Sequence, residues 1–161
     1  MPRQRITPNL WFDTQAEEAA EFYCSIFPNS RIIGVARYPQ DAPGPTGEVM
    51  TVEYELDGQR YVHINGGPEF PFSEAVSFSI ECADQAELDF YWERLLDGGE
   101  ESQCGWLKDR YGFSWQVVPE GIDELFTDPD PGRAHRAFQA MLGMTKLDLA
   151  EMRRAADSVP A

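Results

Sequence analysis

The sequence predicts an α+β fold made of two β-α-β-β-β modules and a helical tail. A strand, a capped helix and further strands occur in this order twice, with a period of about 70 residues. At 161 residues the chain has the size of about one domain. We therefore expect a single domain over 1–161, with module 1 at about 5–66, module 2 at about 74–119 and the tail at about 121–157.

The first strand of each module is indicated by alternating side chains. Residues 6–12 place Leu10 and Phe12 on one face, and residues 77–82 repeat this with Phe78 and Ile80. The opposite face carries mostly polar residues, namely Thr7, Asn9, Trp11, Ser77, Ser79 and Glu81. We expect the apolar faces to pack against the helices and the other faces to be open.

A helix is predicted directly after each of these strands. Thr14 with Glu17, and Asp84 with Glu87, have the spacing of a capping box. The distances Thr7 to Thr14 and Ser77 to Asp84 are equal, which supports the duplication.

Further strands complete each module. Residues 30–38 form one, a loop rich in proline and glycine follows, and residues 48–66 form a hairpin that turns at Asp57-Gly58. Met50, Val52, Tyr54 and Leu56 form its alternating apolar face. In module 2, residues 99–119 hold up to three short strands, with a turn around residues 110–112.

The tail contains two predicted helices, opened by Asp130-Pro131 and by Asp148 with Glu151. The first has an apolar stripe at Ala134, Ala137, Phe138, Met141 and Leu142. This stripe either covers the core of its own domain or forms a dimer contact.

Composition excludes several classes of function. Lys and Arg number 13 against 28 Asp and Glu, a net charge of −15, which disfavours nucleic acid and anionic membrane surfaces as partners. No apolar stretch has the length of a signal peptide or a membrane span, so we expect a cytoplasmic protein. The three cysteines, without a C-x-x-C motif, indicate reduced thiols rather than a disulfide framework or a thiolate zinc site.

Four segments carry a family resemblance. They are ITPNLWFDTQAEEAAEFYCSIFPNSRI, ELDGQRYVHINGGPEF, CGWLKDRYGFSWQVVP and AMLGMTKLDLAEM. With the duplicated module, they resemble the vicinal oxygen chelate superfamily of glyoxalases, dioxygenases and bleomycin-resistance proteins. The closer similarity is to its PhnB-like branch, labelled 3-demethylubiquinone-9 3-methyltransferase, and runs from about residue 5 to residue 154.

The resemblance implies a glyoxalase-like domain with an eight-stranded, U-shaped mixed sheet, helices outside and a cavity inside. It also implies a homodimer, since relatives commonly complete interfaces across a twofold axis.

Metal-dependent relatives hold their ion at four strand positions, which fall here on Thr7, His63, Ser77 and Gln116. A transition metal prefers imidazole, thiolate or carboxylate ligands, and only His63 clearly qualifies. We therefore expect no tightly bound metal, and no cofactor is predicted.

The expected ligand-binding residues are Asn9, Trp11, His63, Asn65, Trp106 and Gln116. His63 is the candidate catalytic residue, as a proton shuttle; the alternative is a structural histidine satisfied by hydrogen bonds. Trp106 either stacks on a flat ligand or packs at a domain edge. Trp115 is expected in the core, while Lys108 and Asp109 are expected as a turn pair in water.

These observations predict a protein that binds a small, planar organic molecule in the sheet cavity without an obligatory metal; the reaction is not specified. One alternative is a methyltransferase acting on a demethylubiquinone-like quinol. However, neither strand-to-helix connection has the glycine that a methyl-donor loop needs. Another is a metal-dependent lyase, isomerase or dioxygenase that uses His63 with a partner-chain carboxylate or Glu81.

Overall fold

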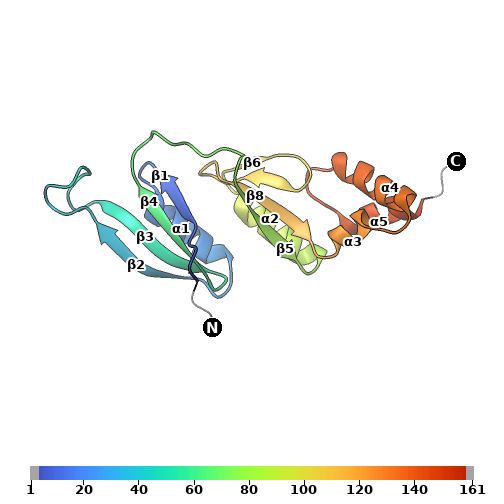
Figure 1. The fold of residues 1–161 in the computed structure, drawn as a ribbon, viewed down its shortest axis with the longest axis horizontal. Coiled ribbons are helices and arrows are strands. Elements are labelled where there is room, and N and C mark those ends of the chain that lie inside the picture. The colour runs from blue at the N-terminus through green and yellow to red at the C-terminus, as the bar shows by residue number, and fades with distance from the viewer. Residues whose placement is uncertain (1–3, 159–161) are drawn as a thin grey trace. The chain divides into compact units, whose positions relative to one another are not determined.

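The structure, a computed structural model, describes residues 4–158. The chain forms two compact units, unit 1 (Met1–Phe72) and unit 2 (Ser73–Ala161). Each unit contains one four-stranded mixed sheet with a helix against it (Figure 1). The two predicted β-α-β-β-β modules are therefore confirmed. Whether all eight strands form a single U-shaped sheet stays a prediction.

Unit 1 has the strand order β1-β4-β3-β2. Its elements are β1 (Asn9–Phe12), α1 (Ala16–Ile26), β2 (Arg31–Arg37), β3 (Val49–Leu56) and β4 (Gln59–Asn65). β1 pairs with β4 in parallel, and the other pairs are antiparallel. Both residues of the Asp57-Gly58 turn have positive φ, as the hairpin prediction requires.

Unit 2 repeats this order as β5-β8-β7-β6. Its module contains β5 (Ser77–Cys82), α2 (Gln85–Leu96), β6 (Glu100–Glu101), β7 (Trp106–Lys108) and β8 (Ser114–Pro119). β5 and β8 are parallel, which matches the pairing of β1 with β4. The edge strand β6 is compressed to two residues, so the second copy is the smaller sheet.

The two module helices begin differently. At α2, Asp84 accepts a hydrogen bond from the Glu87 N–H at 2.8 Å and the Glu87 carboxylate accepts one from the Ala83 N–H, so this predicted capping box is confirmed. The capping box predicted at Thr14 is wrong. The N-cap of α1 is Gln15, whose side chain makes no cap hydrogen bond, and the Ala16 N–H instead donates to a side chain of β4.

The tail packs within unit 2. It forms α3 (Ile122–Phe126), α4 (Pro131–Leu142) and α5 (Leu149–Asp157). Leu147 and Met152 are buried, and Gln85 of α2 donates a hydrogen bond to the Leu147 carbonyl. The tail therefore covers its own unit, although Phe138 and Leu142 of α4 remain 43% and 47% exposed. Among residues 4–158, no helix combines the length and apolar character that crossing a membrane requires.

Candidate functional site

His63 lies in the core of unit 1, where its ring is 0% exposed. Nδ1 donates to the Ala16 carbonyl at 2.9 Å, because a carbonyl can only accept, and Nε2 therefore accepts from the Tyr54 hydroxyl at 2.6 Å. The Phe12 ring packs against the imidazole, with centroids 4.5 Å apart. Burial lowers the His63 pKa to about 4, against the opposite effect of the Ala16 hydrogen bond, so the ring is neutral at pH 7.

The expected position of His63 and Asn65 on the open face is wrong. Parallel pairing places His63 opposite Leu10, and Asn65 opposite Phe12, on the side that faces α1. The sequence contained the signal for this. A two-residue turn at 57–58 pairs His63 with Val52, a residue of the apolar face. These contacts agree with a structural histidine, and they leave neither ring nitrogen free for proton transfer.

Asn9 and Trp11 do lie on the face opposite the helix, as the alternation predicted. Trp11 is engaged with its own unit, since its indole N–H donates to the Gly67 carbonyl at 2.9 Å and its ring meets Phe70 edge-on. A Cβ at Gly66 would lie 2.0 Å from the Trp11 ring, so only glycine fits there. Trp11 therefore anchors the segment after β4.

The open face of unit 2 brings two predicted ligand residues together. Gln116 and Trp106 are paired across β8 and β7, and they share a face with Ser79 of β5. The Gln116 side-chain amide donates to the Ser77 hydroxyl at 2.9 Å. Trp115 points to the other side and is 2% exposed, which confirms its place in the core.

Asp109 is a residue whose role sequence reasoning missed. It is 2% exposed rather than solvated. Its carboxylate accepts hydrogen bonds from the Tyr111 and Phe113 N–H groups and from the Trp115 indole, at 2.9, 3.1 and 2.8 Å. A buried carboxylate therefore organises the turn between β7 and β8. Lys108 instead forms an ion pair with Glu74 at 2.6 Å.

The four positions that the resemblance predicts as metal-ligand positions do not fit a transition metal. Thr7 and Ser77 offer neutral hydroxyls, and Gln116 offers an amide whose nitrogen already bonds Ser77. Both nitrogens of His63 are occupied within the core. Across residues 4–158 the acidic, histidine and cysteine side chains form no group of three or more suited to hold an ion.

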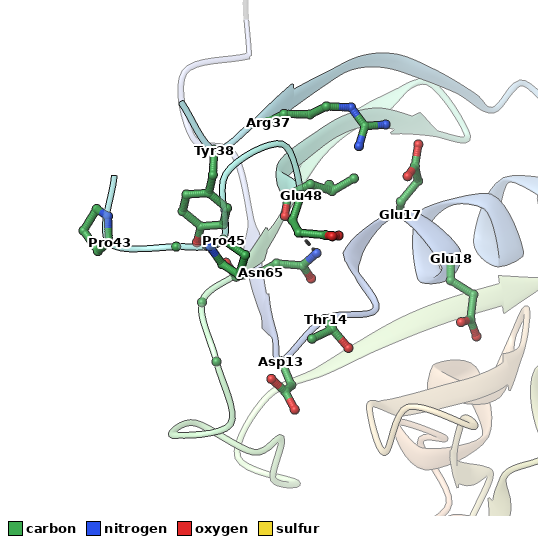
Figure 2. Close-up of a pocket in the computed structure, with 14 residues that line it drawn as sticks. Asp13, Thr14, Glu17, Glu18, Arg37, Tyr38, Pro43, Pro45, Glu48 and Asn65 are labelled. Carbon is green, nitrogen blue, oxygen red and sulfur yellow. Dashed lines mark hydrogen bonds between the residues drawn. The ribbon is translucent and has the colours of Figure 1, made fainter. Parts of the chain in front are cut away.

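A pocket of about 730 Å³ lies in unit 1 where β1 and β4 end and α1 begins. The carboxyl ends of parallel strands meet at one edge of a sheet, which places Asn65 beside the start of α1. The loop between β2 and β3 supplies the other wall, with Tyr38 and Glu48. Figure 2 shows Arg37 and Glu17 toward one end of the pocket and Asn65 between them and Tyr38.

Asn65 joins the walls of this pocket. Its side-chain oxygen accepts from the Ala16 N–H at 2.8 Å, its amide donates to the Val49 carbonyl at 3.1 Å, and its backbone carbonyl accepts from the Tyr38 hydroxyl at 2.5 Å. It thus caps α1 from a neighbouring strand and still keeps one N–H and one lone pair. Of the six predicted ligand residues, Asn65 is the one that lines this pocket.

The loop wall is ordered by its own backbone. Tyr38 N–H donates to the Glu48 carbonyl, and Gly47 N–H donates to the Tyr38 carbonyl, both at 2.9 Å. A Cβ at Gly44 would come within 2.4 Å of the Tyr38 ring, so this glycine allows the loop to pack against the ring. The sequence indicated the Pro/Gly loop but not that the loop lines a pocket. The length of the loop was the available signal, because long loops often carry binding sites.

The comparisons with known proteins agree with this architecture. A PhnB protein from Bacillus cereus is 34% identical, with a TM-score of 0.66, over 72% of this chain and 99% of that one. Protein PA1353 from Pseudomonas aeruginosa is 21% identical, with a TM-score of 0.57, over 73% and 98%. The fosfomycin resistance protein FosX from Listeria monocytogenes is 14% identical, with a TM-score of 0.55, over 77% and 97%, a likeness of fold alone.

The fold is that of the vicinal oxygen chelate superfamily, because the similar structures include PhnB and fosfomycin resistance proteins, which are members of it. Residues 4–118 match the family model described as 3-demethylubiquinone-9 3-methyltransferase, and the chain belongs to this family. No curated protein matches the chain. The superfamily, as the sequence predicted, is one of small-molecule-binding proteins.

Proposed function

We propose that the protein binds a small, planar organic molecule in the pocket of unit 1, without an obligatory metal. The observation that carries this proposal is the pocket itself. Its volume of about 730 Å³ lies within the usual range of about 300 to 1,000 Å³ for ligand sites. The Tyr38 ring and two prolines offer flat apolar contact, and the Asn65 side chain keeps one N–H and one lone pair that no other residue of the described chain occupies.

A second surface for the same function is the open face of unit 2. Trp106 is half-buried there, next to Gln116, and an indole beside an amide suits a flat ligand with hydrogen-bonding atoms. Asn9 and Trp11 occupy the matching face of unit 1. We rank these open faces second to the pocket, because the indole N–H of Trp11 already donates to the Gly67 carbonyl within unit 1.

Methyl transfer, which the family description names, receives no support from the site. The connection from β1 to α1 is Asp13–Gln15 and that from β5 to α2 is Ala83–Asp84, and neither contains a glycine for close approach to a methyl donor. A metal-dependent lyase, isomerase or dioxygenase would need His63 as a ligand, and its nitrogens are committed to Tyr54 and Ala16.

We also propose that the chain acts as one glyoxalase-like domain over 1–161, is cytoplasmic and forms a homodimer. Cys24, Cys82 and Cys104 are free thiols, as a reducing compartment would keep them. The exposed Phe138 and Leu142 of α4 support a contact with a second copy. Sedimentation velocity tests the dimer.

The experiment for the main proposal is a ligand screen with a variant that fills the pocket. Thr14 is exposed and lines the pocket, so Thr14→Trp should occupy the space without disturbing the core. We expect saturation-transfer NMR against aromatic and heteroaromatic metabolites to give binders of the wild type that Thr14→Trp loses and the control Thr14→Ser keeps. Binders that Thr14→Trp retains would move the site to the unit 2 face, and a Trp106→Ala variant would then lose them.

A further inference from the structure

The walls of the unit 1 pocket are unbalanced in charge. Its lining contains four carboxylates, those of Asp13, Glu17, Glu18 and Glu48, and one guanidinium, that of Arg37. At pH 7 the lining therefore carries a net charge of −3.

In the part of the chain that the structure describes, three of these carboxylates have no ion-pair partner. Within residues 4–158, no ion pair involves Asp13, Glu17 or Glu48; the unit 1 pairs are Arg31–Glu55 and Arg60–Glu53. Arg37 donates to the Gly47 carbonyl at 3.2 Å. Among residues 4–158, the carboxylates of Asp13, Glu17 and Glu48 therefore line the pocket without an ion-paired cation.

The start of α1 offsets only part of this charge. A helix N-terminus acts as about half a positive charge, and Glu17 and Glu18 lie in the first turn, where carboxylates stabilise it. Half a charge does not compensate a net −3, so the pocket remains electronegative. An anionic ligand would be repelled both here and by the net charge of −15 on the whole chain.

A metal ion is not the cation that this arrangement suits. Among residues 4–158, no three carboxylate, histidine or cysteine side chains gather closely enough to hold an ion. The carboxylates are instead spread around a wide pocket that also contains the Tyr38 ring, which Asn65 holds in place through the hydroxyl. An aromatic ring beside carboxylates favours a positively charged group on a larger organic body.

We propose, on the basis of the function proposed above, that the ligand of this pocket is a small organic cation: an amine or guanidinium compound with a flat ring. The ring lies against Tyr38 and the loop prolines, and the positive group faces Glu17 and Glu48. Charge therefore selects among planar molecules that the pocket volume alone would admit.

Three probes with one ring system test this proposal at pH 7 and low salt: tyramine, neutral tyrosol and anionic 4-hydroxyphenylacetate. Binding is followed by the side-chain amide signal of Asn65 in ¹⁵N–¹H spectra. We expect tyramine to bind at least about tenfold more tightly than the anion, with tyrosol between them. High salt should reduce this ratio, because the carboxylates are solvent-accessible.

A double variant, Glu17→Gln with Glu48→Gln, should reduce the ratio to about threefold or less. The control Glu93→Gln, on the exposed side of α2, should leave the ratio unchanged. Equal or tighter binding of 4-hydroxyphenylacetate would overturn the cation proposal and leave the proposed binding function intact. If none of the probes shifts the Asn65 signal at millimolar concentration, the binding function at this pocket is contradicted as well.

Discussion

The Tyr54 hydroxyl lies 2.6 Å from Nε2 of His63, and this buried contact joins β3 to β4 beneath α1. The other ring nitrogen reaches the Ala16 carbonyl in the first turn of that helix. His63 therefore connects the sheet to the helix at the place where the pocket begins. His63, which the resemblance offered as a metal-ligand position, contributes here to the core.

This contact predicts a pH dependence of stability. The folded-state pKa of His63 is about 4, below its ordinary value of 6.5, so the unfolded chain binds the proton more readily between these values. The contribution of neutral His63 to the free energy of unfolding is complete above pH 6.5 and is lost as the pH falls toward 4. The free energy of unfolding changes by up to about 1.4 kcal/mol per pH unit in this range, and by about 3 kcal/mol across the whole range.

Urea unfolding at several pH values checks this dependence, with His63→Gln as the matched variant that does not titrate. We expect the wild type to lose more stability than His63→Gln between pH 6.5 and pH 4. Parallel curves for the two proteins would show that His63 titrates normally and is not enclosed.

Asp109→Ala should be strongly destabilising. It leaves three N–H donors, two of them buried, without their acceptor, at a cost of about 3 kcal/mol. The control Asp97→Ala removes an exposed carboxylate paired with Arg110 and should cost within about 0.5 kcal/mol. Chemical denaturation followed by tryptophan fluorescence measures both, and equal effects would contradict the structural role of Asp109.

Asn65→Ala should weaken both fold and ligand binding. The change removes the cap on Ala16 and the bond to the Val49 carbonyl, with an expected loss of about 2 kcal/mol. Asn9→Ala is the matched control, because Asn9 is exposed and, among residues 4–158, its side chain bonds only to the nearby Thr7 carbonyl, so its expected cost is about 0.5 kcal/mol or less. Thermal unfolding and the ligand screen together separate the two variants.

The sequence predicted the architecture well and the site only in part. The repeat, the two helices and the Asp57-Gly58 hairpin are local patterns, and each appears in the structure. The predicted face of His63 was wrong. The prediction used the alternation within one strand and did not use the hairpin pairing of His63 with Val52, which lies on the apolar face. The hydrogen bond by which Asn65 caps α1 joins residues that are far apart in the chain, and no local sequence pattern indicates this bond.

The thiols provide another check on burial. Cys82 is 0% exposed, and burial, with Glu87 nearby, raises its pKa to about 12. At pH 8 its thiolate fraction is then on the order of 10⁻⁴, so a thiol reagent should not label it in the folded protein. Cys82→Ser should leave native labelling unchanged, whereas Cys104→Ser should remove a labelled site; rapid native labelling of Cys82 would contradict the enclosed β5.

S-adenosylmethionine tests the family description directly. A methyl donor present at a hundred times its dissociation constant would stabilise the fold by about 2.7 kcal/mol. We expect no change in the melting temperature, since neither strand-to-helix connection has a glycine. A stabilisation that saturates with donor concentration would instead favour methyl transfer.

The most direct test of the account is ligand binding after removal of metal. Protein dialysed against EDTA, with its metal content measured by mass spectrometry, is titrated with the best ligand of the screen while the Asn65 side-chain amide is observed. If binding needs no metal, the shift saturates with the same dissociation constant before dialysis, after dialysis and after addition of zinc or manganese. Binding that disappears with the metal and returns with it would contradict the proposal that the protein binds its ligand without an obligatory metal.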